Sequence, residues 1–303
     1  MSERSPRVSV VMPAFRHEAW VGEAVRSVLD QDLADLELIV VDDASPDRTA
    51  AHVARIEDPR LRLIRHDTNL GAHAAINRGL AEARAPFLAI INSDDVWAPA
   101  RLSRLTAALE DEGYDLVGSD VALIDAASQP IDDPQHWWNV GFARLKSQLR
   151  ANHDIGVALL HDNLFMTTSN FLFRRRVLNR LEGFRNWRYL HDYDFLLRAL
   201  GEGDLRLGFL ADEPLMAYRL HGRNTIFEDA VAPREECFAL LCELGPDACR
   251  HGAIARVQAL VAHLQALHER ALREQGLRGR LKGNRLLRTG VLPRLSRWRR
   301  RGA

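Results

Sequence analysis

The sequence predicts an α/β fold: a mostly parallel, Rossmann-like sheet flanked by helices, followed by a helical C-terminal extension. Three observations predict it. Short runs of β-branched and other apolar residues alternate with stretches whose apolar residues recur at helical spacing. The runs are continuously apolar, which is typical of parallel strands buried on both faces. The segments between them are long enough to cross over a sheet.

The first part of the chain consists of repeated strand–helix pairs. The predicted strands are residues 7–12, 36–41, 60–65 and 87–91. The predicted helices are residues 20–29, 48–56, 72–83 and 99–109, the last with Pro99 in its first turn. In such a sheet the carboxyl ends of the strands face one crevice, and ligands bind there.

Beyond residue 113 the pattern is less regular. Residues 114–124 fit one or two strands, residues 125–139 a polar loop, residues 166–173 and 205–210 further strands, and residues 191–200 a helix. The pair Trp137 and Trp138 lies in the predicted loop. Two roles are open for these side chains: packing on the body of the domain, or forming a sugar-stacking platform or lid.

The charge of the chain is balanced overall but not locally. Its 303 residues include 41 basic and 41 acidic side chains, so the net charge favours neither nucleic acid nor a membrane. Residues 276–303, however, contain basic residues and no acidic one. Residues 277–301 fit either an amphipathic segment on an anionic membrane surface or a solvated terminus. We expect an α/β domain at residues 1–225, a helical extension at 226–275 and a basic amphipathic tail at 276–303.

The cysteines and the apolar runs bear on the compartment. Cys237, Cys242 and Cys249 match neither a zinc pattern nor a disulfide framework, which favours a reducing cytoplasm. No signal peptide precedes the first predicted strand, and no apolar run is long enough to span a bilayer. We therefore expect a cytoplasmic protein, peripheral on the inner face of the cytoplasmic membrane if the basic tail binds lipid.

Acidic pairs follow two of the predicted strands, and the second pair, Asp94 and Asp95, ends the run at residues 87–91. Magnesium is often shared between one or two carboxylates and substrate phosphates. A glycine-rich phosphate loop is missing, because no Gly-x-Gly-x-x-Gly follows the first strand and the chain has no Walker A motif. The hypothesis is a metal–diphosphate site at Asp94 and Asp95. The alternative is an ordinary strand-to-helix turn with Asp as the cap.

Six short motifs together resemble the family 2 inverting glycosyltransferases, which have a GT-A fold. They lie in the family's order at residues 8–15, 38–45, 69–71, 92–95, 191–194 and 218–221. Each motif alone is weak, but the ordered set is specific and spans roughly the first three quarters of the chain. The resemblance implies inverting transfer of a sugar from a nucleoside diphosphate sugar, here a UDP-sugar. The implied acceptor is a glycan or lipid-linked molecule in bacterial surface-polysaccharide synthesis.

The resemblance also implies which residues bind the donor. It puts the metal, Mn²⁺ or Mg²⁺, chiefly on Asp95, with Asp94 towards the ribose or in the metal shell. That cation would neutralise the charge that builds up on the leaving diphosphate. Asp43 can accept a hydrogen bond from a uracil imide N–H, and turn formation is the alternative reason for an acid there. The full set implied to contact the nucleotide sugar is Pro13, Ala14, Phe15, Asp43, Asn69, Gly71, Asn92 and Asp94.

An acceptor hydroxyl is a poor nucleophile until a positioned base takes its proton. Asp192 matches the family's catalytic base, although His191 stands before it where many members have an acid. Asp192 also lies at a predicted helix start, where a carboxylate is a good cap. Asp194 is a second candidate, for which a structural role in the first helical turn is favoured. His221 is either a third metal ligand, which would favour Mn²⁺, or a packed histidine.

Two other functions are compatible with parts of this pattern. A sugar nucleotidyltransferase usually has a glycine- and lysine-rich loop after the first strand, and residues 13–16 (Pro-Ala-Phe-Arg) are not one. A non-catalytic module that binds nucleotide sugars or glycans would have no use for Asp192 beside Asp94 and Asp95. Nucleic acid is not an expected partner, because no basic and aromatic platform accompanies the tail.

Overall fold

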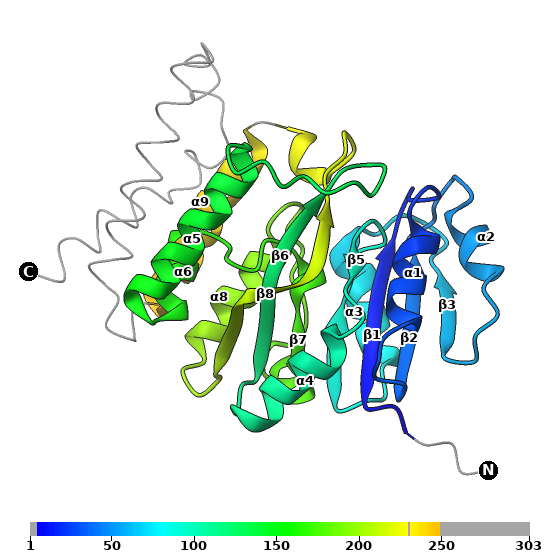
Figure 1. Ribbon diagram of the computed structural model, residues 1–303, viewed down its shortest axis with the longest axis horizontal. Coiled ribbons are helices and arrows are strands. Elements are labelled where there is room, and N and C mark those ends of the chain that lie inside the picture. The colour runs from blue at the N-terminus through cyan, green and yellow to red at the C-terminus, as the bar shows by residue number, and fades with distance from the viewer. Residues whose placement is uncertain (1–4, 230, 249–303) are drawn as a thin grey trace, which may run out of the picture. The chain divides into compact units, whose positions relative to one another are not determined.

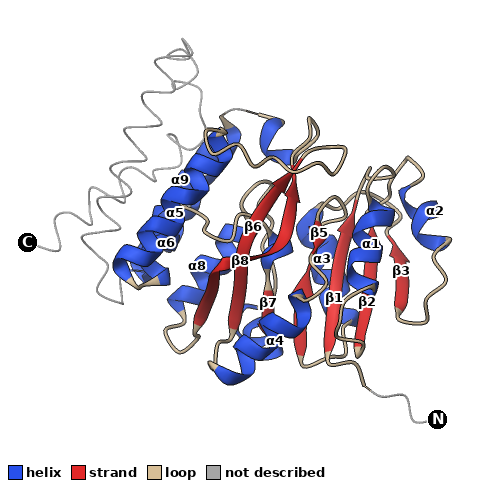
Figure 2. Ribbon diagram, viewed as in Figure 1, coloured by secondary structure: helices blue, strands red, loops and turns tan. Residues whose placement is uncertain are grey.

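A mixed sheet lies at the centre of the structure, a computed structural model that describes residues 5–229 and 231–248 (Figure 1). In the described residues its strand order is β3-β2-β1-β4-β7-β6-β8-β5. Helices cover both faces of the sheet (Figure 2). The strands are β1 (Val8–Ala14), β2 (Leu36–Asp42), β3 (Leu61–Arg65), β4 (Phe87–Ile90), β5 (Val96–Trp97), β6 (Leu116–Ile124), β7 (Leu172–Arg174) and β8 (Leu207–Arg219).

The helices connect these strands in the order expected for crossover connections. They are α1 (Val21–Leu29), α2 (Thr49–Ala54), α3 (Ala72–Glu82), α4 (Arg101–Asp111), α5 (Trp137–Asn152), α6 (Ile155–His161), α7 (Arg175–Leu181), α8 (His191–Gly201) and α9 (Ala232–Ala248), with 3₁₀ turns η1 (Thr168–Asn170) and η2 (Thr225–Phe227). Helix α1 illustrates how an amphipathic helix packs on the sheet. It buries Val21, Ala24, Val25, Val28 and Leu29, which recur at helical spacing along one face.

Strands β1, β2 and β4 form the apolar centre of the first half of the sheet, and the partly buried β3 lies at its edge. Every residue of β1 and of β2 is buried. Strand β1 runs parallel to β2 on one side and to β4 on the other, and β2 runs parallel to β3. Helices on both faces explain why β1, β2 and β4 are continuously apolar. The predictions for residues 7–12, 36–41, 60–65 and 87–91 are confirmed to within two residues.

The second part of the sheet is mixed. Strand β7 pairs antiparallel with both β4 and β6, whereas β6 and β8 run parallel. The two-residue strand β5 follows Asp94 and Asp95 directly and pairs antiparallel with β8, Val96 opposite Ala217 and Trp97 opposite Met216. This short pairing brings the end of β8 to the acidic loop that follows β4.

The prediction of a polar loop over residues 125–139 is wrong at its end. Trp137 begins α5, which runs to Asn152, and α6 follows. The sequence pattern is ambiguous here because the apolar face of α5 is narrow: Trp138, Phe142 and Leu145 are its buried residues. The two tryptophans differ in environment. Trp138 is 5% exposed and its ring is parallel to Tyr218 at 6.2 Å, whereas Trp137 is 60% exposed.

Three other predicted elements differ in extent from the observed ones. The strand predicted at residues 166–173 is mostly the 3₁₀ turn η1, and β7 begins only at Leu172. Side-chain hydrogen bonds explain the difference, since the Thr167 hydroxyl accepts the Ser169 N–H and so caps the turn. The strand predicted at residues 205–210 continues to Arg219. Helix α4 begins at Arg101, two residues after Pro99.

The chain divides into two compact units, residues 1–227 and 228–303. Helix α9 is the described part of the predicted extension at residues 226–275. The basic tail at residues 277–301 and Cys249 lie outside the described residues. Within the described residues, no helix has the length and apolar character needed to cross a bilayer.

The packing of α3 on β1 gives a test of the fold. A Cβ added to Gly79 would lie 2.3 Å from Val11 Cγ1 in the middle of β1. We expect Gly79→Ala to lower the free energy of unfolding by about 1–3 kcal/mol, because a branched strand residue cannot move aside. Urea denaturation measures the change. In the matched control Gly141→Ala, on α5, the added Cβ meets nothing within 4 Å. The control should be neutral or stabilising by up to about 1 kcal/mol, and equal behaviour of the two variants would contradict the packing described.

Candidate active site

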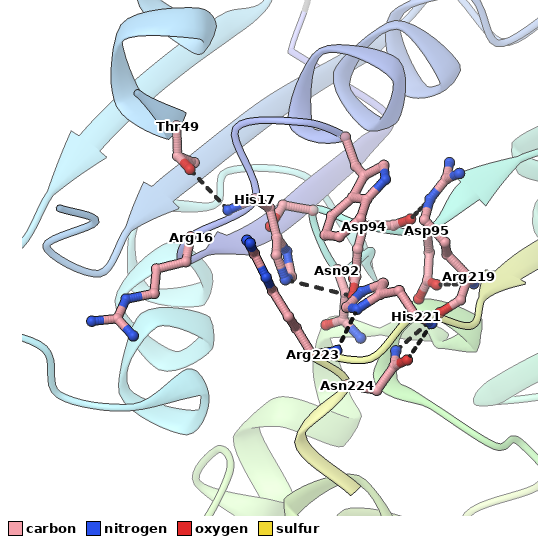
Figure 3. Close-up of polar contacts among 12 residues, drawn as sticks. Arg16, His17, Thr49, Asn92, Asp94, Asp95, Arg219, His221, Arg223 and Asn224 are labelled. Atoms are coloured by element: carbon pink, nitrogen blue, oxygen red, sulfur yellow. Dashed lines mark hydrogen bonds and ion pairs between the residues drawn. The ribbon is translucent and has the colours of Figure 1, made fainter. Parts of the chain in front are cut away.

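Three segments that are distant in the sequence meet at one edge of the sheet, beyond the ends of β1 and β4 (Figure 3). His17 follows β1, and Asp94 follows β4. His221 follows β8, which reaches this edge through its pairing with β5. The meeting point is the crevice expected at the carboxyl ends of parallel strands.

Asp94, His17 and His221 form a cluster of potential metal ligands. Asp94 Oδ2 lies 3.0 Å from His221 Nε2 and 3.6 Å from His17 Nε2. Each residue offers one ligand atom, and the three atoms lie within 4.8 Å of one another. Burial raises the pKa of Asp94, but His17, His221 and a backbone hydrogen bond together lower it by more, so the net pKa is below its usual value. Asp94 is therefore an anion at neutral pH, which suits a cation ligand.

His221 is held on both sides of its ring. Its Nδ1 accepts a hydrogen bond from the Arg223 N–H at 3.0 Å, and the ring of Trp20 stacks on it with centroids 4.2 Å apart. The ring is nearly buried, at 7% exposure. With Nδ1 as the acceptor, Nε2 carries the proton of the neutral ring and faces Asp94. Ligation of a cation by Nε2 would require that proton to move to Nδ1 and the bond from Arg223 to open.

Asp95 makes a different set of contacts from Asp94. It is fully buried; its Oδ2 accepts the Ser169 hydroxyl at 2.5 Å, and its Oδ1 accepts the Arg219 N–H at 2.9 Å. Burial raises the pKa of Asp95 well above its usual value, and the negative charge of Asp94 raises it further. Both oxygens of Asp95 are thus engaged in holding β8 and the η1 segment to the acidic loop.

The two carboxylates have different surroundings. The resemblance put the metal chiefly on Asp95. Among the described residues, the cluster of ligand groups contains Asp94 and His221 but not Asp95. The pairing of β5 with β8 is the physical reason, because it sets the backbone of Arg219 beside the Asp95 carboxylate. Asp94 is left to face the two histidines.

The Arg219 side chain joins four segments around this site. It is fully buried, and its Nε donates to the Asp94 carbonyl at 2.6 Å. Its terminal nitrogens donate to Glu23 Oε2 of α1 and to Ser128 Oγ, both at 2.7 Å. Glu23 supplies the countercharge that a buried guanidinium needs. Helix α1, the turn at residues 125–128, the acidic loop and β8 are therefore fixed to one another.

Asp43 organises the loop that contains Asn69 and Gly71. Its carboxylate accepts the backbone N–H of Leu70 at 2.9 Å and that of Gly71 at 2.8 Å. The Asn69 side chain donates to the Asp43 carbonyl at 3.3 Å, and His66 Nδ1 lies 2.7 Å from Asp43 Oδ1. The structure therefore brings together two motifs that the resemblance placed in the donor site. A carboxylate has about four acceptor positions, so a further donor can still bind Asp43.

The remaining predicted donor residues line the same edge. Pro13 and Ala14 are the last residues of β1, and Phe15 follows them, partly exposed. The Asn92 side chain donates to Thr167 Oγ1 at 2.9 Å and accepts the Thr168 hydroxyl at 3.0 Å. Asn92 therefore positions the acidic loop through its own amide.

Asp192 lies in the first turn of α8 and is 8% exposed. Asn163 Nδ2 donates to its Oδ2 at 2.8 Å, and the Tyr193 N–H donates to its Oδ1 at 2.7 Å. Burial raises the pKa of Asp192 to about 7, despite the hydrogen bonds from Tyr193 and Asn163, which lower it. A carboxylate with such a pKa can take up and release a proton near neutral pH.

The neighbours of Asp192 have other roles. Asp194 is fully buried and is held by Arg198 Nε at 2.8 Å and by Arg185 Nε at 2.9 Å. These ion pairs match the structural role favoured for it. Burial lowers the pKa of His191 to about 4, and the nearby His73 lowers it further, so His191 is neutral at pH 7.

Tyr218, near the end of β8, is the next titratable side chain at this edge of the sheet. Burial raises the pKa of its hydroxyl, and three nearby carboxylates raise it further. These carboxylates belong to Asp95, Asp94 and Asp192. Trp138 packs on the ring of Tyr218.

Three residues of this site were not singled out by the sequence. Trp20 was assigned only to the apolar face of a helix, and His17 and Asn163 to no function. His17 lies two residues after the motif at residues 8–15, in a strand-end loop, and this position is the signal that could have identified it. Asn163 carries no comparable signal, because it lies in an irregular connection between α6 and η1.

Sequence comparison identifies relatives along most of the chain. Residues 9–182 match the family described as glycosyl transferase family 2. The succinoglycan biosynthesis protein ExoO of Rhizobium meliloti is 34% identical over 232 residues, 73% of this chain and 62% of that protein. The uncharacterised glycosyltransferase EpsJ of Bacillus subtilis is 29% identical over 71% of this chain and 61% of its own length. The chain thus spans only about three fifths of the length of these two relatives.

Solved structures with low sequence identity share the fold. TarS of S. aureus, in complex with UDP-GlcNAc, is 18% identical and superposes with a TM-score of 0.64 over 86% of this chain and 71% of that one. The mannosyltransferase PcManGT of Pyrobaculum calidifontis, in complex with GDP-Man and Mn²⁺, is 20% identical, with a TM-score of 0.60 over 96% of this chain and 84% of that one. The predicted GT-A fold is confirmed by these matches. With its family match over more than half of its length, the chain belongs to glycosyl transferase family 2.

Proposed function

We propose that this family 2 glycosyltransferase is an inverting enzyme that moves a sugar from a UDP-sugar to a hydroxyl of a glycan or lipid-linked acceptor. The synthesis of a bacterial surface polysaccharide is the proposed context. A relative named for succinoglycan biosynthesis supports that context. An acceptor on a lipid carrier would make the protein peripheral on the inner face of the cytoplasmic membrane, through the tail at residues 277–301.

The leaving group requires a site that stabilises negative charge. Asp95, Asp94 and His221 are the residues that would hold Mn²⁺ or Mg²⁺. The ionised Asp94 carboxylate and the His221 imidazole lie 3.0 Å apart at a strand end, and His221 would bind the cation once the bond from Arg223 opens. When bound, the cation supplies electrostatic stabilisation of the departing diphosphate. Two structural relatives, PcManGT and the glucosyl-3-phosphoglycerate synthase of Mycobacterium tuberculosis, were solved in complex with Mn²⁺.

The nucleoside would lie along the ends of β1 and β2. Asp43 fixes the loop at residues 69–71 and retains acceptor capacity for a uracil imide N–H. Pro13, Ala14 and Phe15 would contact the base and ribose from the end of β1. TarS, which was solved with UDP-GlcNAc, supports UDP as the carrier.

Asp192 is proposed to take the proton of the acceptor hydroxyl as that oxygen attacks the anomeric carbon. Inversion needs one base and a stabilised leaving group, and Asp192 and the cluster around Asp94 are proposed to supply them. The observation that carries the proposal is the position of Asp94 after β4, where its Oδ2 lies 3.0 Å from His221 Nε2 and 3.6 Å from His17 Nε2. A module that only binds sugars would have no use for a buried carboxylate of pKa about 7.

Replacing the base tests this role directly. We expect Asp192→Asn to lower kcat by about 10²-fold or more, because the amide cannot accept the hydroxyl proton. Donor binding should be largely intact, since Asp192 is not among the donor residues. UDP release with and without acceptor extract measures turnover, and calorimetry with UDP measures binding. Asp111→Asn, at the exposed end of α4, is the control. Near-normal transfer by Asp192→Asn would remove Asp192 from this role.

The pKa of Asp192 sets the expected pH dependence. The carboxylate must be ionised to accept a proton, so kcat/KM should fall about tenfold for each pH unit below about 7. Above that pH, the profile should level off. Initial rates between pH 5 and 8.5, at saturating Mn²⁺, measure it, and UDP binding over the same range separates lost chemistry from lost binding. A flat profile from pH 5.5 to 8 would contradict the assignment.

Removal of the cation is the third test. We expect EDTA to abolish UDP binding and added Mn²⁺ to restore it, because Asp94 and His221 would otherwise face the diphosphate without a countercharge. Calorimetric titration with UDP, before and after chelation, measures the effect. The thermal unfolding temperature in EDTA is the control for an intact fold. A UDP affinity that is the same before and after chelation would refute the metal site.

A further inference from the structure

We propose that His17 is a further protein ligand of the cation, so that the site contains two imidazoles and selects Mn²⁺ over Mg²⁺. The proposal rests on the metal-assisted function proposed above. Its starting observation is the cluster in Figure 3, in which His17 and His221 approach Asp94 from the ends of two different strands.

The backbone before the ring fixes where His17 lies. Arg16 has a positive φ of 58°, which turns the chain sharply after β1. The Arg16 N–H donates to Ser45 Oγ at 3.1 Å, and the His17 N–H donates to Thr49 Oγ1 at 2.9 Å. The loop after β1 is therefore anchored to the loop after β2, and a strained conformation is held in place by specific bonds.

The ring itself is oriented by Ser93. His17 Nδ1 lies 2.8 Å from Ser93 Oγ, which leaves Nε2 facing Asp94. Histidines that bind metals almost always have their other ring nitrogen hydrogen-bonded, because this bond fixes the tautomer and the ring orientation. Ser93 adjoins Asp94 in the sequence, so one short segment supplies both a ligand and the group that orients a second ligand.

The distance between His17 and Asp94 is unlike that of a hydrogen bond. At 3.6 Å, Nε2 and Oδ2 are too far apart for one. Two ligands that each lie about 2.1 Å from one ion are about 3.0 Å apart at an octahedral angle and about 3.4 Å apart at a tetrahedral angle. The separation from Asp94 to His221, 3.0 Å, equals the first value, and that from Asp94 to His17, 3.6 Å, is slightly longer than the second.

Two imidazole ligands would change which cation is preferred. Magnesium demands oxygen ligands and usually keeps several waters, whereas imidazole suits transition metals. A site with carboxylates alone would accept either ion. Adding His17 and His221 gives the site two nitrogen donors, and this donor set discriminates against Mg²⁺.

Direct metal binding tests the proposal. Free Mn²⁺ is counted by electron paramagnetic resonance in titrations of the full chain without any nucleotide, and Mg²⁺ is measured by competition. We expect His17→Gln to weaken Mn²⁺ binding by about tenfold or more and to change Mg²⁺ binding by less than about threefold. Ser93→Ala, which removes only the orienting hydroxyl, should weaken Mn²⁺ binding by a smaller factor. His52→Gln on α2 is the matched control and should bind both ions like the wild type.

The outcomes separate this proposal from the function on which it rests, because no donor or acceptor is present. Unchanged Mn²⁺ binding in His17→Gln, or an equal loss for both ions, would overturn the role of His17. A wild-type protein that binds no Mn²⁺ without nucleotide would overturn it as well. Thermal unfolding of each variant is compared with that of the wild type. The ratio of the Mn²⁺ affinity to the Mg²⁺ affinity is the decisive measurement, because a smaller fraction of folded protein would not change it.

Discussion

The buried guanidinium of Arg219 is the constraint on which the active-site edge depends. It cannot be left without partners inside the protein, and it finds them in Glu23, Ser128 and the Asp94 carbonyl, which belong to three different segments. The backbone N–H of the same residue binds Asp95. One residue at the end of β8 therefore positions both carboxylates of the acidic loop, and its own charge is balanced by α1.

The two neighbouring carboxylates differ in their contacts and in their pKa values because of packing alone. Asp95 is closed in by a hydroxyl and an amide, and burial pushes its pKa upward. Asp94 is faced by two imidazoles, which hold its pKa down. Adjacent acids in a sequence thus divide into one that secures the loop and one that faces two imidazoles. Their order along the chain does not reveal this, since it is set by the pairing of β5 with β8.

The sequence was sufficient where one physical rule acted alone. Strands β1, β2 and β4 were predicted because burial on both faces leaves a continuous apolar run, and β3 was predicted from its alternating pattern. The acidic pairs were placed at strand ends because the apolar runs stop at them. The sequence was insufficient where tertiary contacts determine the local structure. The η1 turn replaces a predicted strand because hydroxyls of Thr167 and its neighbours bind the backbone and Asn92. Trp138 was assigned to a loop because its packing partner, Tyr218, is distant in the sequence.

The contact between Asn163 and Asp192 bears on how Asp192 loses its proton between two catalytic cycles. After each transfer, on the proposed chemistry, Asp192 holds the proton of the sugar acceptor. The Asn163 amide nitrogen can only donate, so its bond to Oδ2 favours the ionised carboxylate over the acid. Asn163 would therefore help to drive the spent proton out to solvent. The side-chain amide of a residue outside every motif recognised in the sequence would then influence how soon Asp192 can take the proton of the next acceptor.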